Sequence, residues 1–386
     1  MESLRHNNLE QDQKQQYKPT RILPHSSCVT AVAFHPKVVG LLAAATFTGD
    51  LFIWVISGDE NIDALLTSTI GNQAAEVTHS DSISVVYWLP SSSSSSKHPL
   101  AVTGNDGLIT IWSVNPLRKK ISLKAGYKFK AGICSLSLNV HDSVTFAAGL
   151  ASGSLVFWSL VSDPEQSIYT LDFDLTTTSV PVYNVSGSTI QASSGPLYGC
   201  EWSPACPGLI AVATCDGTVL LYSQRDPTSP CLRLESSNCG ALFSLCFSRS
   251  RPLLLLSASQ FEGAIVFDLS NSGPSSVVGQ LKAPPNLNNS NEKNATISAS
   301  FNPGGGGRSS IYSLVAVGCE NGSVYLWRIS LDSEGENDFV FALQSLRNLV
   351  SGQEMKDTEK SHGKKSDAKQ KKKKKKKMEI QTNEVE

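Results

Sequence analysis

The stretch Leu100–Trp112, LAVTGNDGLITIW, decides the fold of this chain. Two short apolar runs flank the turn Asn105-Asp106-Gly107, and the second run ends in an aromatic residue. Tight hairpin turns need positive backbone φ angles, which Asn, Asp and Gly tolerate. The stretch is therefore predicted to form a β-hairpin.

The same unit occurs six times along the chain. The other copies are LLAAATFTGDLFIW (41–54), TFAAGLASGSLVFW (145–158), LIAVATCDGTVLLY (209–222), LLLLSASQFEGAIVF (253–267) and LVAVGCENGSVYLW (314–327). The aromatics that close the copies are Trp54, Trp112, Trp158, Tyr222, Phe267 and Trp327. Such repetition is typical of a β-propeller, and these aromatics are expected to pack inside its blades.

A further strand-like run lies upstream of every hairpin. Four of these runs carry an aromatic two residues before a proline: Phe34, Trp88, Trp202 and Phe301. Proline cannot continue a hydrogen-bond ladder, so each strand should end there. Closing aromatics are 58, 46, 64, 45 and 60 residues apart. The shorter intervals match a four-stranded blade of ~40–45 residues. The longer ones predict surface insertions at 91–96, 184–195, 284–293 and 304–307.

Charge and cysteine usage limit the partners. The chain carries 33 Lys+Arg against 34 Asp+Glu, but the final 36 residues hold 12 basic and 7 acidic side chains. Residues 1–350 therefore carry 21 against 27, a mildly acidic body on which nucleic acid binding is not expected. No apolar run predicts a membrane span or a secretion signal. Nine cysteines without a CxxC pair predict reduced thiols in the cytoplasm and no zinc site.

No pattern for catalysis is present. The Gly304–Gly307 run lacks the Lys-Ser/Thr of a phosphate-binding loop, and no histidine lies in a nucleophile pattern. We therefore expect no enzyme, no cofactor, no metal and no small-molecule substrate. A propeller hydrolase is the alternative from another class, and it would need carboxylates clustered at one mouth of the channel.

The repeats resemble the WD-repeat family, in which His, Ser/Thr, Asp and Trp form a buried network in a blade. His79, Asp106 and Trp112 match this pattern, but Gly104 stands where the hydroxyl should be. The first copy has no acid, and its matching residues are His25, Thr46, Thr48 and Trp54. The expected fold is all-β: a WD40-type β-propeller over 25–332, with six recognisable blades of a seven-bladed design.

Several stretches in the same order resemble the WD-repeat intermediate chains of cytoplasmic dynein 2, the ciliary retrograde motor. They are VTAVAFHP (29–36), HSDSISVVYWLP (79–90), GPLYGCEWSP (195–204), CDGTVLLY (215–222), ALFSLCFSRSRPLLLLSAS (241–259), IVFDL (265–269) and VYLW (324–327). The resemblance implies a noncatalytic scaffold at the cytoskeleton of the cilium. Its implied partners are the dynein heavy chain, a second dynein intermediate chain and dynein light chains. A generic WD40 scaffold, such as a ubiquitin-ligase substrate receptor or a ribosome-assembly factor, is the alternative.

The start of the chain departs from that family. The first recognisable strand resembles the family's second blade, and the polar segment 1–24 precedes it. The chain could be a truncated seven-bladed product, close with six blades, or use residues 17–25 as one strand of an imperfect seventh. Truncation is the preferred interpretation, and it puts light-chain recruitment through an N-terminal arm in question.

The C-terminal part divides into a short helix at 333–350 and a disordered Lys-rich tail at 351–386. The helix should lie on its own propeller; partner binding, or an outer strand at 339–343, are the alternatives. Lys371–Lys377 predict a solvated tail, with nuclear import, nucleic acid binding or attraction to acidic surfaces as specific alternatives. The candidate light-chain-binding residues, in a motif that also arises by chance, are Ile380, Gln381 and Thr382.

Overall fold

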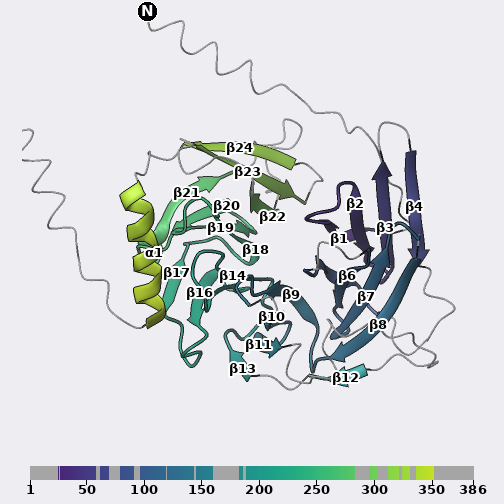
Figure 1. The fold of residues 1–386 in the computed structure, drawn as a ribbon. Helices are drawn as coiled ribbons and strands as arrows, with labels where there is room; N and C mark the ends of the chain where they lie inside the picture. The colour runs from purple at the N-terminus through teal and green to yellow at the C-terminus, as the bar shows by residue number, and fades with distance from the viewer. Residues whose placement is uncertain are drawn as a thin grey trace, which may run out of the picture.

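Six β-sheets surround a common axis in the computed structural model, so the expected WD40-type β-propeller is confirmed (Figure 1). The structure describes residues 25, 27–57, 61–68, 79–90, 96–118, 120–142, 145–159, 182–185, 188–282, 295–302, 312–320, 324–330 and 336–351. Neighbouring blades, numbered 1 to 6 in chain order, touch through their innermost strands. Segment 1–24 and tail 352–386 lie outside the described residues.

Within each blade, consecutive strands pair antiparallel from the innermost strand outward. Blades 1 and 2 contain β1 (Val29–Phe34), β2 (Leu41–Thr46), β3 (Leu51–Ser57), β4 (Asn61–Ser68), β5 (Ile83–Trp88), β6 (His98–Gly104), β7 (Leu108–Asn115) and β8 (Lys120–Lys128). Blades 3 and 4 contain β9 (Ile133–Leu138), β10 (Thr145–Leu150), β11 (Ser154–Ser159), β13 (Ser188–Gln191), β14 (Gly199–Trp202), β15 (Leu209–Ala213), β16 (Thr218–Ser223) and β17 (Leu232–Glu235). Blades 5 and 6 contain β18 (Leu242–Phe247), β19 (Leu254–Ser259), β20 (Gly263–Asp268), β21 (Val277–Leu281), β22 (Thr296–Phe301), β23 (Tyr312–Cys319) and β24 (Val324–Ser330).

Each blade is apolar on both faces because it packs between two others. In blade 2, Trp88, Leu100 and Trp112 lie opposite one another in register and pack with Leu41 and Ile53 of blade 1. We call the face with the closing aromatic the leading face and the opposite face the trailing face. The core of the propeller is therefore a series of contacts between one trailing face and the next leading face.

The polar segment 184–195, expected as a surface insertion, instead contributes to two sheets. β12 (Val182–Asn184) pairs in parallel with β8, and β13 forms the outer strand of blade 3. An outer strand needs few apolar residues because solvent meets one of its edges. The polar sequence of β13 therefore gave no sign of a strand. The expected insertions at 284–293 and 304–307, and most of 91–96, lie outside the described residues.

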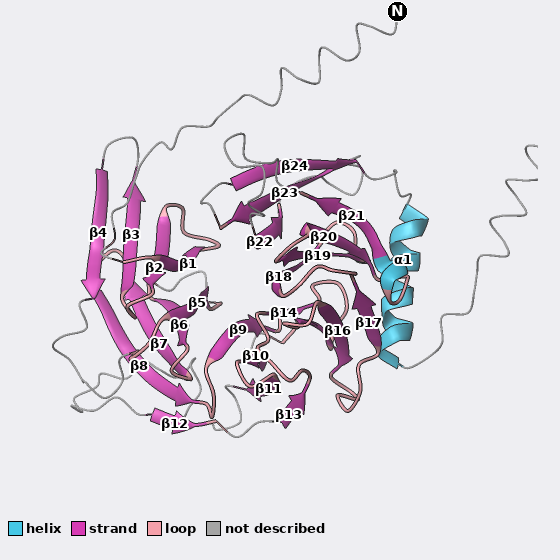
Figure 2. Ribbon diagram, turned by 180° about the vertical axis from the view of Figure 1, so that it is seen from behind, coloured by secondary structure: helices cyan, strands magenta, loops and turns pink. Residues whose placement is uncertain are grey.

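Helix α1 (Glu336–Ser351) packs on the outside of the propeller beside β16 and β17 (Figure 2). Its buried residues Ala342 and Leu346 face the sheets, and Ser223 Oγ donates a 3.1 Å hydrogen bond to the Val350 carbonyl. The alternative of an outer strand at 339–343 is therefore wrong. No helix among the described residues is long and apolar enough to cross a membrane.

Candidate interaction surfaces

The six blade aromatics occupy equivalent positions on the third strand of each blade. Trp54, Trp112, Tyr222 and Phe267 are buried, whereas Trp158 and Trp327 are half-buried. Trp158 still meets several rings, with centroids 4.5 Å from Tyr127 and 5.3 Å from Phe146. These positions are those of packing residues, so surfaces for partners have to be sought elsewhere.

Blade 2 contains a buried polar network. His79 Nδ1 lies 3.2 Å from Asp106 Oδ1, and His79 Nε2 lies 3.0 Å from Thr110 Oγ1. The Trp112 indole N–H donates to Thr110 Oγ1 over 2.9 Å. Burial opposes ionisation of Asp106, but the hydrogen bond and charge of His79 and two backbone N–H groups hold its pKa below the usual value. The network fixes the connection into blade 2 against its own leading face.

Thr110 supplies the hydroxyl that the sequence pattern seemed to lack. Gly104 occupies the expected hydroxyl position, but a Cβ atom there would lie 2.6 Å from His79 Nδ1 and 2.8 Å from Asp106 Oδ1. The histidine ring therefore occupies the space of a side chain at 104. One signal could have revealed Thr110: it precedes Trp112 by two residues and so lies on the same face of β7.

Gly104→Ser, which restores the residue type of the family pattern, is therefore expected to destabilise the chain. The new Cβ must displace His79 or Asp106, which costs about 1–3 kcal/mol. Chemical denaturation of the variant and the parent measures the difference. Ser152→Ala, in an exposed turn, is the control. A Gly104→Ser chain as stable as the parent would show that the network has room for a second hydroxyl.

A pair of histidines joins blades 1 and 2. The rings of His35 and His98 are buried, with centroids 4.5 Å apart, and His35 also meets Trp88 at 5.0 Å. His35 Nδ1 accepts the N–H groups of Lys37 and Val38. Burial, with the charges of His98 and Lys37, lowers the pKa of His35 to about 4, and burial also lowers that of His98. Sequence reasoning had not brought these two residues together.

This pair should make the propeller sensitive to acid. The unfolded chain takes up a proton near pH 6.5, whereas folded His35 resists protonation down to about pH 4, so stability falls as pH drops between these values. His35→Asn keeps an acceptor for the two N–H groups and is expected to remove about 1–2 kcal/mol of this loss. His141→Asn is the control, measured by thermal unfolding from pH 7.5 to 4.5. An unchanged acid response in His35→Asn would assign the sensitivity elsewhere.

The carboxyl group of Glu201, on β14, should make stability depend on pH in the direction opposite to that of His35. Burial raises its pKa to about 7, against the N–H of Phe247, which donates over 2.6 Å, and the charge of Arg249. The folded state holds this proton to about pH 7 and the unfolded state releases it near pH 4.5, so stability falls as pH rises between them.

Glu201→Gln is therefore expected to stabilise the chain at pH 8 by about 1–3 kcal/mol, because the amide keeps the acceptor and avoids a buried charge. At pH 4.5 the gain should largely vanish. Thermal unfolding at both pH values measures it, with the exposed Glu320→Gln as control. An equal effect at both pH values would mean that ionisation of Glu201 is not its source.

The cysteines lie in the described parts of the chain, and all nine are unpaired. Cys28 is exposed, and the others are buried or half-buried. Burial raises the pKa of Cys134, Cys200, Cys231 and Cys246 to about 11, so these thiols are protonated at neutral pH. Within the described ranges, no group of three or more His, Cys, Asp or Glu side chains could hold a metal ion.

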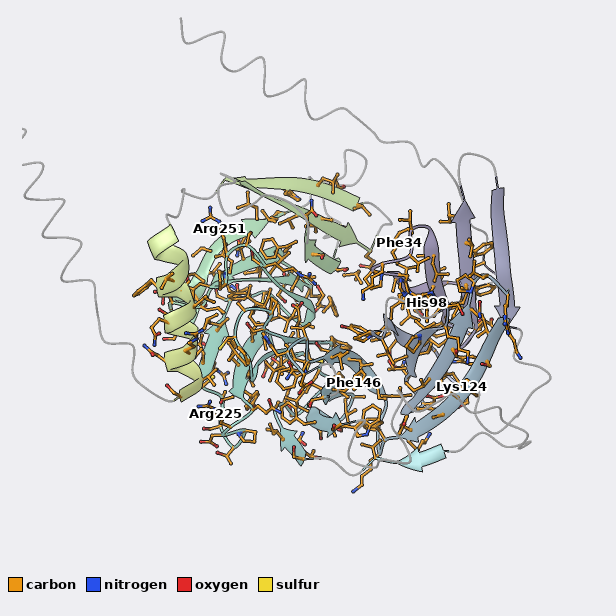
Figure 3. All side chains as sticks on the ribbon, in the orientation of Figure 1. Phe34, His98, Lys124, Phe146, Arg225 and Arg251 are labelled. Carbon is orange, nitrogen blue, oxygen red and sulfur yellow. The ribbon has the colours of Figure 1, made fainter. Side chains whose placement is uncertain are left out.

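Blade 1 exposes a position that the other blades bury. Phe34 pairs in register with Leu42, which pairs with Trp54, on the leading face. Its side chain is 66% exposed, and Val32, two residues earlier, is 64% exposed. Residues at the position of Phe34 are at most 6% exposed in the other blades: Trp88, Leu138, Trp202, Phe247 and Phe301. Figure 3 shows Phe34 on the side of blade 1 nearest blade 6.

Blade 6 likewise exposes, on its trailing face, positions that the other blades bury. Val324 and Leu326 on β24 are 68% and 56% exposed. The residues that match Val324 in the other blades are fully buried: Leu51, Ile109, Leu155, Val219 and Ala264. We call Val32 and Phe34, with Val324 and Leu326, the open faces. They are blade-to-blade contact surfaces that no described blade covers.

Comparison with known proteins agrees with the resemblance read from the residues. No family model matches the chain. The chain is 25% identical over 341 residues to cytoplasmic dynein 2 intermediate chain 2 of Mus musculus, and 24% identical over 345 residues to that of Homo sapiens. Each match covers 84% of this chain and 59% of the relative, so the chain spans under two thirds of these relatives. It is also 21% identical over 252 residues to protein transport protein SEC31 of Mycosarcoma maydis, covering 53% of this chain and 17% of that protein.

Proposed function

We propose that this chain is a noncatalytic scaffold subunit of the cytoplasmic dynein 2 complex, and that it binds the dynein heavy chain for retrograde transport in cilia. The observation that carries the proposal is the similarity to dynein 2 intermediate chains over 84% of the chain. The fold and this similarity favour a structural subunit over an enzyme. A second intermediate chain and light chains, through Ile380–Thr382, are further proposed partners.

A propeller holds partners through the turns at the two ends of its channel. The turn between the first and second strands and the turn between the third and fourth lie at the same end, because consecutive strands run antiparallel. Val39 and Val140 lie between the first and second strands of blades 1 and 3. Leu117 lies between the third and fourth strands of blade 2. Their side chains are 97%, 50% and 84% exposed. Three consecutive blades thus present exposed apolar side chains at one end.

We assign the heavy-chain contact to this set, which we call the Val39 end. Covering exposed apolar side chains removes them from water, which is the main favourable contribution in most protein–protein associations. The opposite end, formed by turns between second and third strands, carries Phe47 and Phe261, which are 62% and 48% exposed. These two residues provide a matched comparison.

The test is affinity purification of the tagged full chain from ciliated cells. Recovery of the dynein 2 heavy chain supports the proposal. Recovery of ribosomal or ubiquitin-ligase subunits without any dynein subunit would favour the generic scaffold instead. Substituting Asp for Val39, Leu117 and Val140 together should reduce heavy-chain recovery about tenfold or more, since each charge meets a desolvated contact. Substituting Asp for Phe47 and Phe261 should leave it unchanged; the reverse pattern would move the contact to the other end.

A further inference from the structure

The charged residues in the connections between strands separate by sign along the channel. Because consecutive strands run antiparallel, successive connections lie at alternate ends of the propeller. At the Val39 end, the described connections contain two acidic residues, Asp142 and Asp226, and six basic ones: Lys37, Lys97, Arg118, Arg225, Arg249 and Arg251. At the opposite end they contain two basic residues, Lys130 and Lys282, and six acidic ones: Asp50, Asp81, Asp106, Asp216, Glu262 and Glu320. The described connections therefore have formal charges of +4 at the Val39 end and −4 at the other.

Three of the basic connections form one continuous area on blades 1 and 2. The ring contact between His35 and His98 places the β1–β2 connection beside the β5–β6 connection. Asn115 Nδ2 donates a hydrogen bond to Ser96 Oγ over 3.5 Å, which places the β5–β6 connection beside the one between β7 and β8. Within their described parts, these three connections contain no acidic residue. Their positive charges therefore add over one area.

This area also carries apolar side chains that face solvent. The Arg118 N–H donates to Asn115 Oδ1 over 3.0 Å, which fixes the turn that presents Leu117. Val39 and Leu117 are the two most exposed large apolar side chains among the described residues. We call the area the basic surface, and its exposed residues are Lys37, Val39, Lys97, Leu117, Arg118 and Lys120.

The chemistry of the basic surface narrows the kind of ligand that fits it. Its positive charge attracts anionic partners and repels cationic ones. A nucleic acid would supply phosphates for the cations, but its backbone would leave Val39 and Leu117 in water. An acidic peptide with apolar side chains pairs with the cations and also removes these two residues from water, which is favourable. Charge and apolar exposure together therefore favour a peptide.

We propose that the basic surface binds an acidic peptide segment that carries apolar side chains. This proposal rests on the proposed function, in which the segment belongs to the dynein heavy chain. Carboxylates of the segment pair with Lys97 and Arg118, and its apolar side chains pack on Val39 and Leu117. The opposite end of the propeller repels the same segment, because the described connections there are acidic. Charge thus selects the end at which the segment binds.

The test measures, by fluorescence anisotropy, binding of the full chain to a labelled synthetic peptide in which Leu recurs at every third or fourth position among Glu residues. The same peptide with Lys in place of Glu should not bind. The double variant Lys97→Glu/Arg118→Glu should bind the Glu peptide about tenfold or more weakly, mainly through slower association, and added salt should weaken binding to the parent. Lys97→Gln/Arg118→Gln should give an intermediate loss.

Lys130→Glu/Lys282→Glu, at the opposite end, is the matched control. It changes the net charge by the same amount as Lys97→Glu/Arg118→Glu and should bind the Glu peptide like the parent. Equal unfolding temperatures of the variants and the parent show that every chain is folded. Equal loss of binding in the two double variants would assign binding to net charge alone and overturn the proposal.

Other results also overturn the proposal. A Glu peptide that binds Lys97→Glu/Arg118→Glu as tightly as the parent, or binds neither, does not use the basic surface. Tighter binding of a single-stranded poly-dT oligonucleotide than of the Glu peptide assigns the surface to nucleic acid. Equal heavy-chain recovery from ciliated cells with the parent and with Lys97→Glu/Arg118→Glu places that contact elsewhere. If no heavy chain is recovered while the Glu peptide binds as expected, the proposed function fails and the basic surface stands.

Discussion

Phe267→Ala is expected to lower the free energy of unfolding by about 3–5 kcal/mol. Phe267 is fully buried, and it packs in one cluster with Leu255 of its own blade and with Leu209 and Leu221 of blade 4. Removing the ring loses the transfer energy of the phenyl group and leaves a cavity that paired strands cannot collapse to fill. Chemical denaturation of the full chain, followed by tryptophan fluorescence, measures the change.

Phe341→Ala is the matched control for this prediction. Phe341 lies on the outer side of α1 and is 54% exposed, and alanine is a better helix former than phenylalanine. Its replacement should change stability by less than about 0.5 kcal/mol. Similar losses at 267 and 341 would show that the blades do not stack as described.

Asp106→Ala is expected to cost about 3–5 kcal/mol at neutral pH, because the buried His79 ring and two backbone N–H groups lose the carboxylate to which they are hydrogen-bonded. The side chains of Asp106 and His79 are 7% and 2% exposed. The two backbone N–H groups are those of Ser80 and Leu108. Asp226→Ala, at an exposed turn, is the control and should lower the stability much less.

The pH dependence separates this effect from a simple loss of packing. The pKa of Asp106 is held below its usual value, so the carboxylate stabilises the fold above about pH 4 and loses this effect as pH falls through its folded pKa. The difference between the parent and Asp106→Ala should therefore shrink in acid. A difference that stays constant down to pH 3 would contradict the ionised carboxylate of Asp106 as its cause.

The repeated hairpins were predictable because their signals are local. Gly49, Gly107, Gly153 and Gly217 all have positive φ angles, as the turn chemistry requires. The turn recurs six times, with its glycine five residues before the closing aromatic in five copies and four residues before it in the copy of Gly263, and this leaves few folds other than a propeller. The apolar spacing of 338–350 likewise indicated a helix, and the buried side of α1 carries Ala342 and Leu346.

The features that could not be predicted depend on contacts across the fold. Gly104 cannot carry the expected hydroxyl because the His79 ring occupies the space of a side chain there, and this contact exists only in the folded blade; Thr110 on the next strand carries the hydroxyl instead. His35 and His98 lie 63 residues apart in sequence and meet only once blades 1 and 2 are stacked. β13 lacks the apolar periodicity that would reveal a strand in the sequence, and its position in the blade follows from its pairing with β11.

The exposed thiol of Cys28 offers a practical handle. It lies one residue before β1 in blade 1, while the other eight cysteines are shielded to different degrees. A maleimide dye added to the native chain should therefore attach first at this position, without any engineered cysteine. Its fluorescence would then report, in real time, when a partner covers this part of blade 1.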